Sequence, residues 1–190
     1  MFALALISML AAPANLAAPA NAKPVPFVWD VPAGWRTETI PFPLEFAPSL
    51  KHRGLEELRF SPGMMKPAEA DFWSYAFVWW LEDERAPSAA ALEKELAVYF
   101  RGLSEAVGKE KYKFDPARFK AHFRQDGDSI VGQIDSYDAF KTGKPITLNF
   151  RAHVSSCGKN TALAVAISPA DLKAPIWTQL DELTAKFHCP

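Results

Sequence analysis

The chain of 190 residues carries 21 basic and 22 acidic residues, and its formal net charge of −1 offers no field that would draw in nucleic acid or an acidic membrane surface. Hydrophobic residues make up 49% of the sequence, which is enough for one sizeable core at this length. We therefore expect a single domain over residues 23–190 and no nucleic-acid partner.

The first 22 residues predict a secretory signal peptide. Met1–Ala22 holds no charged residue, has an apolar run over Phe2–Ala12 and ends in the small residues Ala20–Ala22, a pattern typical of a cleavage site. The run is too short for a permanent transmembrane helix, because the hydrocarbon core of a bilayer requires about 20 apolar residues. It lacks the usual basic start of a signal peptide, which leaves a disordered tail as the alternative. We expect the mature chain to begin at Lys23 and to be periplasmic or secreted, with no membrane span.

The residues that follow predict extended structure interrupted by turns. Val28–Val31 is a short strand or an extended arm, Pro32–Gly34 is a turn, and Trp35–Ile40 is a second extended piece. Leu55–Phe60 predicts a strand that ends at the turn sequence Ser61–Gly63.

An aromatic segment, Asp71–Leu81, predicts a longer strand. Alternation places four aromatic side chains on one face and a second apolar set on the other. The first set is Trp73, Tyr75, Phe77 and Trp79, and the second is Phe72, Ser74, Ala76, Val78 and Trp80. A core strand under a helix explains both sets. The alternative is an apolar groove, joined by Trp29 and Trp35, that binds a lipid, a glycan or a partner segment.

Ser88–Val107 predicts an α-helix. Ser88 can accept hydrogen bonds from the free N–H groups of the first turn, and apolar residues recur at three- and four-residue steps. This apolar stripe consists of Leu92, Leu96, Tyr99, Phe100, Leu103 and Val107. We expect Gly108 to end the helix in the left-handed conformation.

Phe119–Ile167 predicts four antiparallel strands joined by three hairpins, with turns at Asp126–Gly127, across Lys141–Pro145 and around Cys157–Asn160. With these turns, apolar residues of neighbouring strands share one face. The first hairpin pairs Phe123 with Ile130, Ala121 with Gly132 and Phe119 with Ile134; the second pairs Ile134 with Ala152 and Asp135 with Arg151; the third pairs Val154 with Leu163, Ala152 with Val165 and Phe150 with Ile167.

The fourth of these strands is apolar on both faces, because alanines alternate with larger apolar residues over Ala162–Ile167. Such a strand is normally covered on both sides, so we expect it to be central. The chain then closes with an amphipathic helix within Asp171–Phe187, with Pro175 in its first turn. This helix should pack on the sheet.

The two cysteines, Cys157 and Cys189, are expected to form a disulfide. An even number of cysteines in an exported chain can pair in an oxidising compartment. The bond would tie the C-terminal end to a turn. The spacing is neither that of a C-x-x-C pair nor joined to a histidine cluster, so no metal or redox site is predicted.

Together these elements predict an α+β domain in which an antiparallel sheet packs against two helices. The element order, the Pro32–Trp35 piece near the mature start and the passage from Ser168–Pro169 to Phe187 resemble PsbP-like domains, small exported α+β domains best known as photosystem accessory subunits. The resemblance implies an accessory or binding domain rather than a catalyst. No functional residue of that family carries over to this chain.

Known catalytic and nucleotide-binding motifs are absent from the sequence. It has no P-loop, no G-x-G-x-x-G, no G-x-S-x-G and no H-E-x-x-H. The four histidines, His52, His122, His153 and His188, lie far apart, so only the fold could bring them together. No metal and no cofactor are predicted.

Polar side chains share the outward face of the predicted four strands. They are Lys120, His122, Arg124, Gln133, Asp135, Tyr137, Asn149, Arg151 and His153. One interpretation is a solvated surface with an exposed ion pair between Asp135 and Arg151. A second is a binding face on which Arg151 and His153 hold an anionic or polar ligand. A third is catalysis by His153.

Acidic residues predict no further site. Glu82–Glu84 lies in a strand-to-helix connection, where carboxylates favour the positive end of the helix dipole. Glu56 and Glu57 have no acid partner at a defined spacing, so a pair of glycosidase carboxylates is not predicted.

The sequence thus favours an exported, non-catalytic binding or accessory protein, whose partner is an unidentified small molecule or an envelope protein. The alternative is a small periplasmic hydrolase or lyase that uses His153 with Asp135 or a glutamate on the polar face. Such a catalyst needs a base within hydrogen-bond reach of an orienting partner inside a cleft. A third candidate is a structural envelope protein that acts through a large apolar surface.

Overall fold

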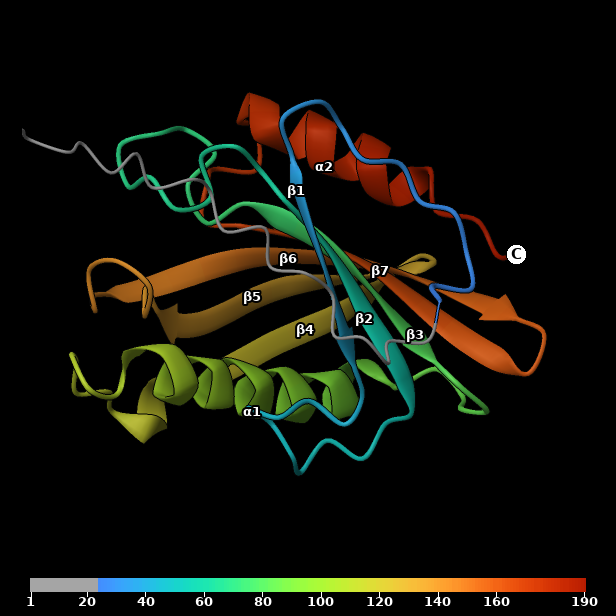
Figure 1. Ribbon diagram of the computed structural model, residues 1–190, viewed down its shortest axis with the longest axis horizontal. Helices are drawn as coiled ribbons and strands as arrows, with labels where there is room; N and C mark the ends of the chain where they lie inside the picture. The colour runs from blue at the N-terminus through green and yellow to red at the C-terminus, as the bar shows by residue number, and fades with distance from the viewer. Residues whose placement is uncertain (1–23) are drawn as a thin grey trace, which may run out of the picture.

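The computed structural model describes residues 24–190, which form a seven-stranded antiparallel sheet and two α-helices (Figure 1). This confirms the predicted α+β fold. The predicted signal peptide, residues 1–22, lies outside the described residues. The strands are ordered β1-β2-β3-β7-β6-β5-β4 across the sheet. The elements are β1 (Arg36–Pro41), β2 (Gly54–Phe60), β3 (Tyr75–Leu81), α1 (Ala89–Gly108), a 3₁₀ turn (Pro116–Arg118), β4 (Lys120–Asp126), β5 (Ser129–Tyr137), β6 (Pro145–Cys157), β7 (Asn160–Ser168) and α2 (Pro175–Ala185).

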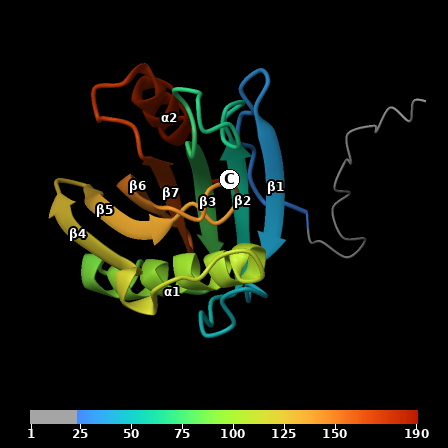
Figure 2. The same ribbon diagram turned by 90° about the vertical axis from the view of Figure 1, so that its left-hand side faces the viewer.

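The two helices lie on opposite faces of the sheet (Figure 2). Helix α1 packs across β4 and β5, and α2 packs across β7 and β3 in the middle of the sheet. Strands β4, β5 and β6 therefore extend beyond α2 on its side of the sheet. Side chains on that part of the sheet, such as His122, Gln133 and His153, are exposed.

An apolar core fills the space on each face of the sheet. Under α1, Leu96 and Phe100 pack with the first aromatic set of the β3 segment. Under α2, Leu180 packs with Ala76, Val78 and Trp80. Every residue of β3 is buried, and so are Trp29 and Trp35. The aromatic segment is therefore a core strand, and the alternative of an exposed aromatic groove is wrong.

Helix α1 begins as predicted but ends differently. The Ser88 hydroxyl accepts the N–H of Ala91 at 3.2 Å, as expected for a helix N-cap. Gly108 is the last helical residue and does not adopt a positive φ, so its predicted left-handed role is wrong. A Cβ at this position would lie 2.7 Å from the Phe114 ring and 3.1 Å from the Ala139 carbonyl oxygen. Close packing, and not backbone conformation, accounts for this glycine.

The first predicted hairpin has the right strands and the wrong partners. Phe123 faces Gly132 and not Ile130, and Ala121 faces Ile134, a shift of two residues from the predicted register. Gly127 takes the first position of the two-residue turn with φ 59°, a conformation that glycine adopts without strain. The predicted turn, Asp126–Gly127, has this glycine at the second position. Because side chains alternate with a period of two, the shift leaves each residue on its predicted face.

The second hairpin is shifted by four residues, and the predicted pair of Asp135 with Arg151 is wrong. Asp135 faces Thr147, and Arg151 faces Val131. The turn starts earlier because the Asp138 carboxylate accepts the backbone N–H groups of residues 141 and 142, and the Asp138 N–H donates to the carbonyl of residue 144. The register of the third hairpin is confirmed for all three predicted pairs.

The predictions for the fourth strand and the last helix are confirmed. Strand β7 is the middle strand of the sheet, and α2 begins with Pro175 at its first turn. Of the two alternatives predicted for Val28–Val31, the structure shows the extended arm. One difference concerns the aromatic strand, because β3 begins at Tyr75 and not at Asp71. The preceding Trp73 has φ 52°, which breaks the extended run.

The disulfide between Cys157 and Cys189 is present, with 5.3 Å between the Cα atoms. It joins the end of β6 to the C-terminal tail that follows α2. Because the cysteines are 32 positions apart in the sequence, the bond removes many conformations from the unfolded chain.

Replacing both Cys157 and Cys189 by serine is expected to lower the free energy of unfolding by about 3 to 4 kcal/mol, the loop-closure entropy of a span of this length. Urea unfolding followed by circular dichroism measures the change. Wild-type protein unfolded in the presence of a reductant is the control and should match the variant. Equal stability of the oxidised and serine forms would show that the bond contributes nothing.

Candidate functional site

Five of the predicted polar residues line one hollow of about 610 Å³ on the sheet. They are His122, Arg124, Gln133, Asn149 and Arg151. The remaining lining residues are Glu93, Phe123, Val131, Gly132, Phe150 and Leu172. The hollow exists because α2 stops short of β4–β6, while Leu172, from the connection before α2, stands at one side of it.

Strand alternation gathers the polar residues of the hollow on one face. Ile134, Leu148 and Ala152 are buried in the core under α1, so the residues between them point to the α2 side. Gln133 and Asn149 are direct cross-strand neighbours, and His122 is the neighbour of Gln133 on β4. The three side chains therefore form a row across three strands.

A chain of hydrogen bonds orients the two amide side chains of this row, Gln133 and Asn149. The Gln133 side chain donates to Asn149 Oδ1 at 3.0 Å, and Asn149 Nδ2 donates to the carbonyl oxygen of Ala170 at 2.9 Å. The Trp177 indole N–H of α2 donates to the same carbonyl at 3.1 Å. The floor of the hollow is thus tied to the connection before α2, which holds its amide groups in fixed positions.

Arg151 links the sheet to α2. Its guanidinium pairs with the Asp181 carboxylate and lies 4.9 Å from the centre of the Trp177 ring. Partial burial raises the pKa of Asp181, while Arg151 and His153 act in the opposite direction. Arg151 is only partly exposed, so its charge faces the hollow from a position that two contacts define.

Glu93 of α1 stands at the opposite edge of the hollow. One carboxylate oxygen accepts the backbone N–H of Phe123 at 2.6 Å, which covers part of the free edge of β4. The other ionisable side chains of the lining are basic: His122, Arg124 and Arg151. Arg124 itself pairs with exposed Asp126 at 3.3 Å. The lining therefore carries two arginines and one carboxylate, and each arginine also pairs with a carboxylate outside the lining.

Four predicted site residues lie outside the hollow. Asp135 accepts a hydrogen bond from Thr147 at 2.6 Å, and Lys120 faces Asp135 across the strands. Tyr137 is buried among Phe114 and Phe119 in the core on the α1 side, so its predicted place on the polar face is wrong. His153 lies 3.0 Å from the Ser129 hydroxyl.

The geometry gives His153 no orienting carboxylate on β5. His153 faces Ser129, whereas Asp135 is six residues further along the same strand, roughly 20 Å away at the rise of a β-strand. A general base and its partner must lie within hydrogen-bond reach. The pair of His153 with Asp135 that a hydrolase would use is therefore not formed.

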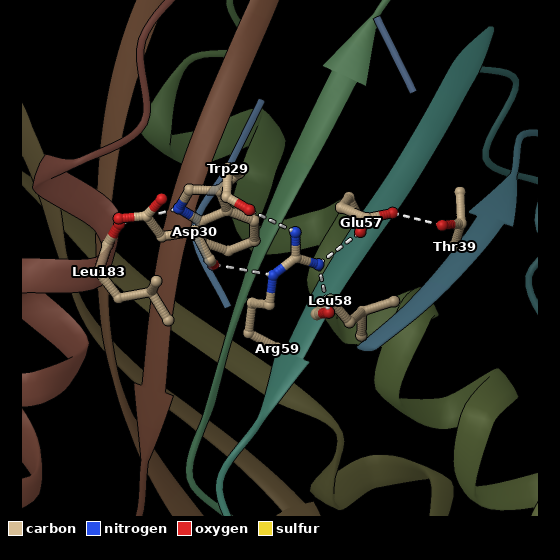
Figure 3. A network of polar contacts seen from close by, with 7 residues as sticks. All are labelled: Trp29, Asp30, Thr39, Glu57, Leu58, Arg59 and Leu183. Carbon is tan, nitrogen blue, oxygen red and sulfur yellow. Dashed lines mark hydrogen bonds and ion pairs between the residues drawn. The ribbon is translucent and has the colours of Figure 1, made fainter. Parts of the chain in front are cut away.

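A buried ion pair that the sequence analysis missed fastens the N-terminal arm to the sheet (Figure 3). Arg59 and Glu57 of β2 pair with each other while only 4% and 6% exposed. Arg59 also donates to the carbonyl oxygens of Trp29 at 2.9 Å and Asp30 at 3.1 Å. Its guanidinium lies 4.6 Å from the Trp29 ring centre. The sequence signal for this network was the presence of Glu57 and Arg59, two residues of opposite charge, inside the predicted strand Leu55–Phe60.

Two further hydrogen bonds, drawn in Figure 3, connect this network to β1 and to α2. Glu57 accepts a hydrogen bond from the Thr39 hydroxyl of β1, and Trp29 donates its indole N–H to the Leu183 carbonyl of α2 at 2.8 Å. The arm is thereby held to β2 and to α2 together.

The other acidic residues singled out in the sequence have structural partners. Asp83 pairs with Arg53 at 3.3 Å and Lys159 at 2.8 Å, and Glu84 contacts His52 at 2.6 Å. These contacts hold Asp83 and Glu84 in place. Across residues 24–190, no group of three or more His, Cys, Asp or Glu side chains is placed to hold a metal ion.

No protein-family model matches this chain, and neither a curated protein nor a solved structure shows a significant match to it. Within residues 24–190, no helix has the length and apolar character that crossing a membrane requires.

Replacing Arg59 by methionine is expected to lower the free energy of unfolding by about 3 to 5 kcal/mol, because Glu57 would remain as an unpaired buried charge. Chemical unfolding measures this, with near-ultraviolet circular dichroism to follow the packing of the tryptophans. The matched control is Arg53→Met, whose pair with Asp83 is exposed to solvent and should contribute little to stability. Equal losses in the two variants would contradict a special role for Arg59.

Proposed function

We propose that this protein is an exported, non-catalytic binding or accessory protein, and that it binds a small anionic ligand in the hollow on β4–β6. The observation that carries the proposal is the convergence there of His122, Arg124 and Arg151 with the oriented amides of Gln133 and Asn149. Guanidinium and amide N–H groups are the donors that proteins use for carboxylate and phosphate oxygens.

The position of the hollow supports reversible binding. Its floor is a rigid sheet, and its sides are Glu93 of α1 and Leu172 of the connection before α2. Fixed donors lose little conformational entropy when a ligand binds, so even a small ligand can gain affinity from them. A bound anion would compete with the Asp181 carboxylate for Arg151, and this competition would lower the affinity of the site for the anion.

Two features support export and an accessory role. The disulfide is compatible with an oxidising compartment, in agreement with the expected signal peptide. The element order that resembles PsbP-like domains favours an accessory or binding domain. A hydrolase or lyase is the less supported function, because the pair of His153 with Asp135 is not formed.

A thermal-shift screen with inorganic phosphate and with mono-, di- and tricarboxylates tests the binding site. A ligand at 100 times its dissociation constant should stabilise the protein by about 2.7 kcal/mol. Replacing Arg151 by glutamine should weaken the binding of the best ligand about tenfold or more, since it removes a charge-assisted hydrogen bond. Isothermal titration calorimetry measures the affinity.

The matched control for the binding test is Arg101→Gln, on the exposed side of α1, which removes the same charge at a residue that does not line the hollow. Its affinity for the ligand should equal that of the wild type. Equal losses in the two variants would indicate a general effect of net charge, and no stabilisation by any anion of the panel would overturn the proposed site.

A further inference from the structure

Glu56 is a fully buried acid in the core between the sheet and α1. Its side chain is 0% exposed, and alternation along β2 sends it to the face opposite that of Glu57. The Trp79 indole N–H donates to one carboxyl oxygen at 3.0 Å, and the Tyr99 hydroxyl of α1 donates to the other at 3.3 Å. In the part of the chain that the structure describes, no basic side chain forms an ion pair with Glu56.

The titratable groups around Glu56 do not supply a positive charge in contact with it. On β1, Glu38 lies on the same face and adds negative charge, with Arg36 beyond it over the Phe60 ring. On β3, Tyr75 has a buried hydroxyl that lacks a hydrogen-bond partner among residues 24–190. On α1, Tyr99 is the nearest phenol. His52 stands beyond Trp79 and is already engaged with carboxylates, Glu84 at 2.6 Å and Glu95 at 3.3 Å.

A carboxylate in this position would be a buried charge without a counter-charge, which proteins avoid by keeping the group neutral. Burial raises the pKa of Glu56 to about 8, the nearby Glu38 acts in the same direction, and the hydrogen bonds from Trp79 and Tyr99 oppose this only in part. Glu57, its neighbour in sequence, is instead paired with Arg59 on the other face.

We propose that Glu56 carries a proton in the folded protein at neutral pH and forms a proton-dependent latch between β2 and α1. In the neutral form the acid joins Trp79 of β3 and Tyr99 of α1 within the aromatic core. Loss of the proton leaves a negative charge under α1 and weakens the packing of this helix on the sheet. An exported protein meets the pH of its surroundings, so such a latch would make the domain tighter in acid than in alkali.

The sign of the pH dependence follows from proton linkage. A glutamate in an unfolded chain loses its proton near pH 4.5, whereas folded Glu56 keeps it up to about pH 8. Between these values the folded state binds one more proton, so the folding equilibrium constant falls about tenfold for each unit of rising pH. The contribution of Glu56 is complete below pH 4.5 and is lost as the pH rises through about 8.

The test compares wild type with Glu56→Gln by chemical unfolding at several pH values. The ratio of the two folding constants should fall by about 400-fold between pH 5 and pH 8, because all other titrating groups cancel in the ratio. The matched control is Tyr99→Phe, which disturbs the same cluster and keeps the acid. It removes a hydrogen bond that lowers the pKa of Glu56, so its pH dependence should persist and extend to higher pH.

A spectroscopic measurement reads the proton directly and does not require a stable variant. In infrared spectra at pH 7, wild type minus Glu56→Gln should show the carbonyl band of an undissociated carboxylic acid. If the variant does not fold, the side-chain carboxyl carbon of Glu56 is titrated by NMR in wild-type protein labelled with ¹³C-glutamate. A constant ratio of folding constants, absence of the band, or titration of Glu56 near pH 4.5 would each overturn the proposal.

Discussion

Strands β3 and β7 form the middle of the sheet and are buried on both faces, and this burial constrains the rest of the molecule. On one face, large aromatics of β3 require the long helix α1 as a cover. On the other face, the small side chains of Ala162, Ala164 and Ala166 let α2 approach β7 closely. A single helix of eleven residues covers β3 and β7 but not β4–β6. The hollow proposed as the binding site is a consequence of this unequal cover.

Strand β2 shows two ways in which a core accommodates a carboxyl group. Glu57 remains paired with Arg59, whose other N–H groups donate to backbone carbonyls of the N-terminal arm, so the buried charges are balanced. Glu56 has two neutral donors and no cation, so burial favours its protonated form. The two adjacent glutamates thus have different roles. Glu57, paired with Arg59, helps to hold the N-terminal arm, and Glu56 couples the packing of α1 to pH.

Within the candidate site, sequence reasoning predicted the face of most residues but not their partners. His122, Gln133, Asn149 and Arg151 point to the same side of the sheet, as the alternation indicated. The prediction that Asp135 pairs with Arg151 is wrong because the Asp138 side chain accepts backbone N–H groups, so that the turn starts earlier than predicted. The prediction that Tyr137 lies on the polar face is wrong because Tyr137 ends β5, where its ring packs against Phe114 and Phe119. These contacts depend on hydrogen bonds and packing at the turn after β5, which the alternation of polar and apolar residues along the strands does not indicate.

The sequence by itself determined the strands and helices, the central place of β7 and the side of the sheet on which most side chains lie. These properties depend on the period of apolar residues, which a shift of two or four residues leaves unchanged. Tertiary structure alone decided the cross-strand partners of the first two hairpins, the contacts of Arg59 with the N-terminal arm, the pairing of Arg151 with Asp181 and the isolation of Glu56 from any cation. These depend on where turns close and how far a helix reaches, so they arise only when segments distant in sequence come together.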